Sequence, residues 1–212
     1  MIRVLVVDDH PIVRLGLATT LMESSDCRVT GEAKSGSEAL EMMRKQKPDV
    51  ILLDIDMPGM SGLDVLNQVH AEMPEIKVLI LSNYSEKRYA VRCLRAGAVG
   101  YIAKTSALAE VLVAIRKVMR NGKYISPSLG ELLAAEISSE TAAIPHEVLS
   151  NREFQVLCML GQGNSVLSIA EALSLSPSTV NKYRAQILQK MNMRTTADLI
   201  RYALENRLTD TM

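Results

Sequence analysis

Over its first 120 residues the chain alternates short runs of Val, Ile and Leu with longer amphipathic segments. Residues 50–53 and 78–81 are apolar at every position, which is typical of parallel strands buried on both faces. This alternation predicts βα units wound around a parallel sheet. The expected strands cover residues 2–7, 28–33, 49–54, 76–82 and 99–103. The expected helices cover residues 11–23, 36–46, 62–72, 84–96 and 107–120.

The rest of the chain has a different pattern. Residues 121–147 are rich in Gly, Pro and small polar side chains, so we expect a linker with a short helix near 131–137. Residues 148–212 show no alternating strand pattern and are expected to be all-helical. The sequence therefore predicts an α/β domain over 1–120 and a helical domain over 148–212.

Composition excludes several classes of protein. Hydrophobic residues make up 48% and charged residues 23% of the chain, which predicts a packed core rather than disorder. No apolar run approaches the ~18 residues of a membrane-spanning helix, and the chain opens with a strand and carboxylates rather than a signal peptide. Cys27, Cys93 and Cys158 form no Cys-x-x-Cys pair that would favour disulfides or zinc. We expect a cytoplasmic protein.

Charged and polar residues follow the predicted strands where each strand ends. Asp8 and Asp9 end the first strand, Asp54 the third and Ser82 the fourth, and Lys104 follows the fifth. Because parallel strands share one carboxyl edge, these side chains are expected to meet. Clustered carboxylates repel unless a cation neutralises them, and their hard oxygens suit Mg²⁺. With Lys104, such an ion could stabilise a phosphoryl group moving onto Asp54 of the central strand.

Residues 1–120 resemble the receiver domains of response regulators. The resemblance is carried by Asp8-Asp9, the Asp54–Gly62 loop, Ser82, Ala96-Gly97-Ala98, Tyr101 and Lys104. It implies a flavodoxin-like (CheY-like) fold with five parallel strands, and Asp54 as the phosphoacceptor. It departs from the family at Thr105, where many members have a proline after a cis peptide, and at Asn83, where a small apolar residue is usual. A non-proline cis bond costs about 3 kcal/mol, so that geometry is not assumed here, and whether the Lys104–Thr105 peptide is cis stays open.

The resemblance also implies roles for the surrounding residues. Asp9 and Asp54 would ligate Mg²⁺ directly, Asp8 largely through water, and Asp56 through its backbone carbonyl. Ser82 would hydrogen-bond a phosphoryl oxygen, Tyr101 would rotate inward as Ser82 moves, and Lys104 would pair with the phosphoryl group. His10, beside the cluster, is expected to be a surface side chain rather than a ligand.

The C-terminal segment contains a helix-turn-helix pattern. Ser150 and Glu153 form a capping box for one helix, and a short helix over 166–173 is followed by a turn. The next helix, 177–191, begins at Pro177, and residues 177–194 carry no acidic residue. Two short helices with a basic second helix predict DNA binding.

We expect the DNA contacts to come from this second helix and the residue that follows it. Ser178 and Thr179 at its N-terminus suit phosphates, Asn181 suits adenine and Lys182 suits guanine. Arg184 lies off the apolar stripe and is a further candidate contact. Lys190 and Arg194 are expected at phosphates, which position the protein without specifying sequence.

Residues 149–206 resemble the NarL/FixJ (LuxR-type) output domain, and the run from Ser176 to Arg184 is similar to the subgroup of global regulators typified by GacA and BvgA. The chain departs from that family at Val166-Leu167-Ser168, usually Asn-Lys-Glu, and at Tyr183, often His. In the family the last helix forms a dimer interface. Here the two alternatives, a dimer interface or a cap on the core, stay open for the apolar residues of 196–206, namely Leu199, Ile200, Ala203 and Leu204.

The sequence predicts a DNA-binding response regulator. By resemblance, a sensor histidine kinase phosphorylates Asp54, and the chain then forms a homodimer on double-stranded DNA and regulates transcription. We expect no enzymatic turnover beyond the receiver's own phosphoryl transfer and autodephosphorylation. One alternative is a phosphatase using the Asp54-Ile55-Asp56 motif; another is a regulator whose receiver only dimerises. The cognate kinase, the operator, the target genes and the choice between activation and repression stay open.

Overall fold

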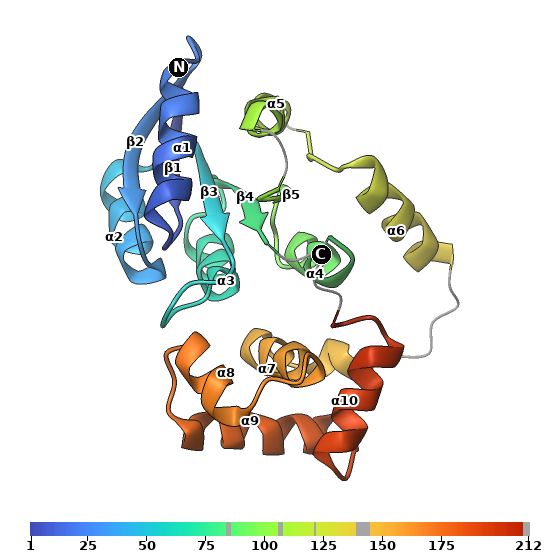
Figure 1. The fold of residues 1–212 in the computed structure, drawn as a ribbon. Helices are drawn as coiled ribbons and strands as arrows, with labels where there is room; N and C mark the ends of the chain where they lie inside the picture. Colours follow the sequence, from blue (N-terminus) through green and yellow to red (C-terminus); the bar gives the residue numbers. More distant parts are fainter. Residues whose placement is uncertain (84–85, 106–107, 121, 139–144, 210–212) are drawn as a thin grey trace. The chain divides into compact units, whose positions relative to one another are not determined.

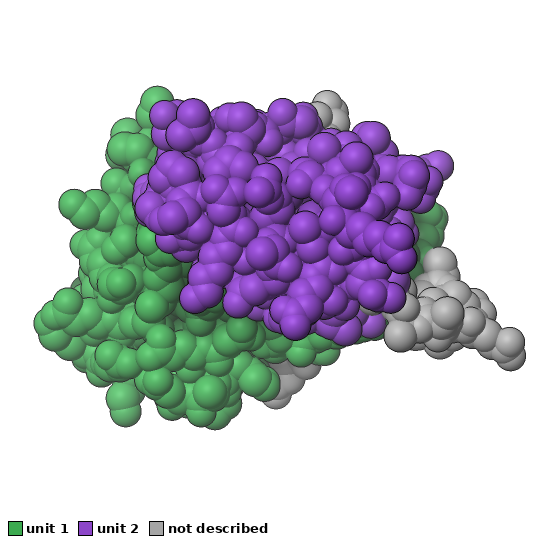
Figure 2. All heavy atoms as spheres, turned by 90° about the horizontal axis from the view of Figure 1, so that it is seen from below, with its two compact units in different colours: residues 1–134 green, residues 135–212 purple. Residues whose placement is uncertain are grey.

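The computed structural model describes residues 1–83, 86–105, 108–120, 122–138 and 145–209. The chain forms two compact units, Met1–Ala134 and Ala135–Met212, coloured green and purple in Figure 2.

The first unit is built on a five-stranded parallel sheet with strand order β2-β1-β3-β4-β5 (Figure 1). The strands are β1 (Ile2–Val7), β2 (Cys27–Ala33), β3 (Val50–Asp54), β4 (Lys77–Ser82) and β5 (Gly100–Ala103). The helices are α1 (Pro11–Met22), α2 (Gly36–Gln46), α3 (Gly62–Glu72), α4 (Glu86–Arg95) and α5 (Leu108–Met119). The doubly wound fold predicted from the sequence is confirmed. The expected helix starts at residues 84 and 107 lie outside the described residues.

Burial explains why the inner strands β3 and β4 read as continuous apolar runs. All five residues of the central strand β3 are buried, including Asp54. Helices α1 and α5 pack together on one face of the sheet, where Leu17 and Leu21 meet Val111 and Ile115 in one core cluster. Helices α2, α3 and α4 cover the other face (Figure 1). The carboxyl edge of the sheet is left for polar side chains.

The predicted linker contains a longer helix than the sequence indicates. Helix α6 spans Pro127–Ser138, beginning four residues before the helix expected near 131–137. Its first turn is capped by Ser126, whose Oγ accepts from the Leu129 amide at 3.1 Å. Proline at the first helical position, with its fixed φ, favours this earlier start.

The described residues of the second unit are all-helical, as predicted. It contains the 3₁₀ turn η1 (Pro145–Val148) and the helices α7 (Asn151–Gly161), α8 (Val166–Ala172), α9 (Pro177–Lys190) and α10 (Thr196–Glu205). Each of the four α-helices begins with a Ser or Thr whose hydroxyl accepts from the backbone amide three residues on: Ser150, Ser165, Ser176 and Thr195. These caps fix the helix boundaries that the sequence predicted.

Candidate functional site

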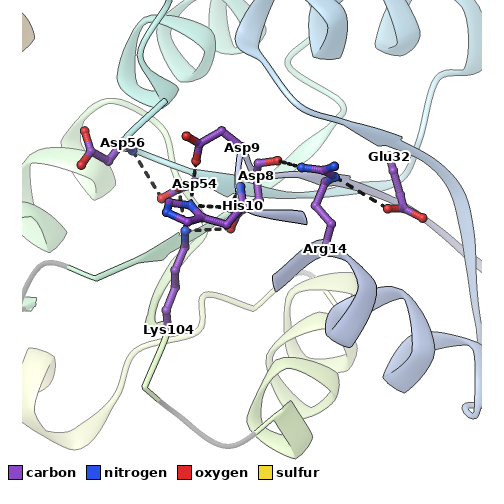
Figure 3. A network of polar contacts seen from close by, with 8 residues as sticks. All are labelled: Asp8, Asp9, His10, Arg14, Glu32, Asp54, Asp56 and Lys104. Atoms are coloured by element: carbon purple, nitrogen blue, oxygen red, sulfur yellow. Dashed lines mark hydrogen bonds and ion pairs between the residues drawn. The ribbon is translucent and has the colours of Figure 1, made fainter. Parts of the chain in front are cut away.

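Three strand ends bring Asp8, Asp54 and Lys104 together at the carboxyl edge of the sheet (Figure 3). The Lys104 Nζ lies 2.7 Å from Asp8 Oδ2 and 2.7 Å from Asp54 Oδ2. Both carboxylates are 1% exposed and the Lys104 side chain is 7% exposed. One ammonium therefore serves two buried carboxylates, which leaves one negative charge in excess at this point.

This imbalance affects the titration of Asp54. Burial raises the pKa of Asp54 to about 6, because a charged carboxylate is poorly solvated there. The charge of Lys104 and its hydrogen bond oppose that rise, whereas the neighbouring charge of Asp8 adds to it. A further cation at this edge would favour the ionised carboxylate, the form that can act as a nucleophile.

Asp9 and His10 complete an acidic pocket. The His10 Nδ1 lies 2.8 Å from Asp9 Oδ1 and 3.2 Å from Asp8 Oδ1, and the His10 amide donates to Asp8 Oδ1 at 2.9 Å. One donor atom from each of Asp8, Asp9, His10 and Asp54 lies within 4.8 Å of the others. Three oxygen donors in this spacing fit a hard divalent ion, so the pocket could bind a metal.

His10 and Arg14 hold positions that the sequence did not predict. The His10 side chain is 57% exposed, yet its ring nitrogen turns toward the carboxylates rather than away from them. The Arg14 Nη1 donates to the Asp8 backbone oxygen at 2.6 Å and thereby fixes the loop after β1. In the sequence, His10 directly follows two carboxylates at the end of a strand. That neighbourhood is the one sequence feature that could have placed His10 in the site.

The remaining predicted site residues lie around this centre. The Asp56 amide donates to Asp54 Oδ1 at 3.3 Å, and its side chain is exposed and directed away from the centre (Figure 3). Ser82 ends β4 and Tyr101 lies within β5, both wholly buried. Tyr101 therefore already lies inward in this structure. No cis peptide occurs in the described part of the chain, so the bond between Lys104 and Thr105, which the sequence left open, is trans.

In the second unit, α9 presents a polar face. The sequence predicts an apolar stripe of Val180, Ile187, Leu188 and Met191 on this helix; Val180, Ile187 and Met191 are buried and Leu188 is half-buried. The predicted contacts that are exposed are Ser178, Asn181, Lys182, Lys190 and Arg194, and those of intermediate exposure are Thr179 and Arg184. The hydroxyls of Ser178 and Thr179 lie 2.7 and 2.8 Å from the Oγ of the capping residue Ser176.

Lys190 has a structural partner that sequence reasoning missed. Its Nζ lies 2.7 Å from Oε2 of Glu153, whose side chain is 3% exposed. Burial by itself would raise the pKa of Glu153, but the hydrogen bonds from Lys190 and from Ser150 outweigh burial and lower it. Lys190 therefore joins the end of α9 to the start of α7. Its side chain is nevertheless 41% exposed.

The apolar residues of α10 differ in burial. Leu199 and Ala203 are wholly buried and cap the core of the second unit. Ile200 is half-buried and Leu204 is 55% exposed. The core therefore accounts for two of the four residues, and Leu204 remains exposed on this unit.

Comparison with known proteins agrees with this architecture. Residues 4–116 match the response regulator receiver domain, and residues 147–203 match the LuxR family of bacterial regulatory proteins. The chain is 39% identical over 211 residues to response regulator GacA of Pseudomonas viridiflava, covering 99% of both chains. It is 35% identical over 209 residues to response regulator UvrY of Escherichia coli K12, covering 98% of this chain and 96% of the relative.

A solved structure extends the agreement to the fold. RcsB of Salmonella enterica serovar Typhimurium, bound to promoter rprA in the presence of the phosphomimetic BeF3⁻, aligns with a TM-score of 0.62 and 23% identity. The alignment covers 95% of this chain and 97% of RcsB. Within the described residues, no helix has the length and apolar character needed to cross a membrane.

The fold and its acidic strand edge define a receiver domain, and the second unit defines a LuxR-type DNA-binding domain. The chain belongs to the NarL/FixJ family of two-component response regulators.

The raised pKa of Asp54 links its protonation to stability. The folded pKa is about 6 and an unfolded Asp titrates near about 4. The folded chain therefore binds the extra proton, and its free energy of unfolding falls as the pH rises through this window. Asp54→Asn has no such proton to lose. We therefore expect the free energy of unfolding of Asp54→Asn, minus that of wild type, to be about 2 kcal/mol larger at about pH 7.5 than at about pH 4.5.

Urea denaturation in metal-free buffer at the two pH values measures this difference. Asp56→Asn is the matched control, because it removes an exposed carboxylate from the same loop; the pH-dependent change in its difference from wild type should be smaller than that of Asp54→Asn. An Asp54→Asn difference that is constant, or smaller at the higher pH, would contradict the raised pKa.

Proposed function

We propose that this response regulator accepts a phosphoryl group on Asp54 from a sensor histidine kinase and thereby controls DNA binding by α9. The observation that carries the proposal is the single buried ammonium of Lys104, 2.7 Å from both Asp8 and Asp54. We assign residues 1–120 to the receiver, 121–147 to the linker and 148–212 to the DNA-binding domain of a cytoplasmic protein.

The transfer is a substitution at phosphorus. A carboxylate oxygen of Asp54 forms the new P–O bond as the P–N bond of the kinase phosphohistidine breaks, and the electron pair leaves with the imidazole nitrogen. Lys104 then pairs with the phosphoryl oxygens, and Ser82 donates to one of them. Turnover is limited to this transfer and to hydrolysis of the resulting acyl phosphate.

The acidic pocket would hold Mg²⁺ through Asp9 and Asp54, with Asp8 acting largely through water and Asp56 through its backbone carbonyl. When bound, Mg²⁺ supplies positive charge to the phosphoryl oxygens. Support comes from the oxygen donors of Asp8, Asp9 and Asp54, grouped within 4.8 Å around a buried excess of negative charge.

On DNA, α9 would enter the major groove. Asn181 and Lys182 would meet base edges, and Ser178, Thr179, Arg184, Lys190 and Arg194 would meet or approach phosphates. RcsB, which shares the fold, was solved on a promoter in the presence of a phosphomimetic. The exposed Leu204 of α10 supports a homodimer on paired half-sites.

Labelling with a small phosphodonor tests the acceptor. Incubation with acetyl phosphate and Mg²⁺ should add one phosphoryl group per chain in wild type and in Asp56→Asn, and none in Asp54→Asn. Asp56→Asn is the control because it keeps the backbone carbonyl. Intact-mass spectrometry measures the adduct. Equal labelling of Asp54→Asn would refute Asp54 as the acceptor, and many phosphates released per chain would favour the phosphatase alternative.

Substitution within α9 tests the DNA contacts. Lys182→Ala should weaken binding to a preferred site by about 1–3 kcal/mol, because it removes a base contact. Arg201→Ala is the control, since Arg201 pairs with Asp198 at 2.9 Å on α10. Fluorescence anisotropy with labelled duplexes measures the DNA affinity of both variants. If the two variants lose affinity equally, α9 is not the reading helix.

A further inference from the structure

The outer edge of the sheet at β5 is extended by the chain that follows α5. Tyr124 forms an isolated parallel bridge with Gly100, and its amide donates to the Val99 carbonyl oxygen at 2.8 Å. Since β5 is an edge strand, Tyr124 adds to the sheet as a short further strand would. The beginning of the linker is therefore hydrogen-bonded to the receiver fold.

The Tyr124 side chain adds contacts to α5. Its hydroxyl donates to Glu110 Oε1, and Lys117 Nζ lies 5.7 Å from the ring centroid. The ring also packs against the core cluster shared by α1, α5 and the sheet. Tyr124 is thus held by a strand and a helix together. We call Tyr124, Val99, Gly100 and Glu110 the linker anchor.

The backbone at Gly100 matches this anchor. A Cβ at position 100 would lie 2.8 Å from the Tyr124 Cβ, 2.8 Å from its carbonyl oxygen and 2.8 Å from Leu79 Cδ2. Atoms do not pack that closely, so any side chain at this position would push Tyr124 away from β5. The close approach of linker and strand depends on glycine.

A short path joins the anchor to the phosphoacceptor site. Strand β5 has four residues, Gly100–Ala103, and Lys104 follows it directly, its amide donating to the Ser82 oxygen at 2.8 Å. The anchor therefore holds one end of β5 while the ion pair with Asp54 holds the residue after its other end. On the linker side, Ser126 caps α6 two residues beyond Tyr124.

We propose that the linker anchor stabilises the arrangement in which Lys104 pairs with the free Asp54 carboxylate, and that phosphorylation weakens it. This inference rests on the proposed phosphorylation of Asp54. As Lys104 follows the phosphoryl oxygens, the strand that precedes it shifts, and the Tyr124 contacts at the other end of that strand are lost. Linkage is reciprocal, so removing the anchor must favour binding of a phosphoryl mimic.

Hydrogen exchange of the Tyr124 amide tests the first half of the proposal. The full chain is measured with Mg²⁺, before and after addition of beryllofluoride. We expect exchange at Tyr124 to accelerate at least about fivefold while amides of β1 stay unchanged. Exchange that stays constant or slows would overturn the proposal.

Substitution at the anchor tests the reciprocal half. Gly100→Ala should bind beryllofluoride at least about threefold more tightly than wild type. Gly16→Ala is the matched control, because a Cβ there meets no atom within 4 Å. Tyr124→Phe, which keeps the ring and removes the hydroxyl bond to Glu110, should shift the affinity in the same direction by less. If Gly100→Ala does not fold, the affinity of Tyr124→Phe for beryllofluoride alone tests the proposal.

The outcomes distinguish failure of the proposed phosphorylation of Asp54 from failure of the linker anchor. Wild-type chain that fails to bind beryllofluoride refutes the proposed phosphorylation of Asp54. Wild-type chain that binds it, with Gly100→Ala or Tyr124→Phe binding equally or more weakly, refutes the linker anchor alone.

Discussion

A single buried ammonium shared by two carboxylates organises the first unit. Lys104, Asp8 and Asp54 come from three different strand ends. Their contact therefore requires the carboxyl ends of β1, β3 and β5 to lie at the same edge of the sheet. Buried ion pairs contribute little net stability, and removing one partner costs several kcal/mol because the other charge is left uncompensated. The arrangement therefore adds little to the stability of the fold. It keeps a local excess of negative charge, which a bound cation or a chemical change at Asp54 can alter.

The same geometry explains how a change at Asp54 can reach beyond the site. Lys104 directly follows a strand of four residues, and the opposite end of that strand carries Tyr124 and the start of the linker. In the second unit the pair of Lys190 and Glu153 joins the end of α9 to the start of α7.

Much of the first unit could be predicted from the sequence, because burial on both faces produces continuous apolar runs in β3 and β4 and leaves their polar residues at the strand ends. Asp8, Asp54 and Lys104 were recognisable on that ground. The partners of His10 and Arg14 were not, since a side chain's direction in a loop depends on contacts that no local pattern encodes. The pairing of Lys190 with Glu153 spans 37 residues and two helices, so it depends on tertiary packing. The early start of α6 depends on a cap, Ser126, that a linker-like composition concealed.

The most direct test is the DNA affinity of the full chain with and without beryllofluoride in Mg²⁺, for wild type and Asp54→Asn. If phosphate at Asp54 controls α9, wild type should change its affinity at least about fivefold, within the usual range of allosteric coupling, and Asp54→Asn should not change. Equal affinity of wild type in both conditions, or an equal response of Asp54→Asn, would contradict control of DNA binding through Asp54.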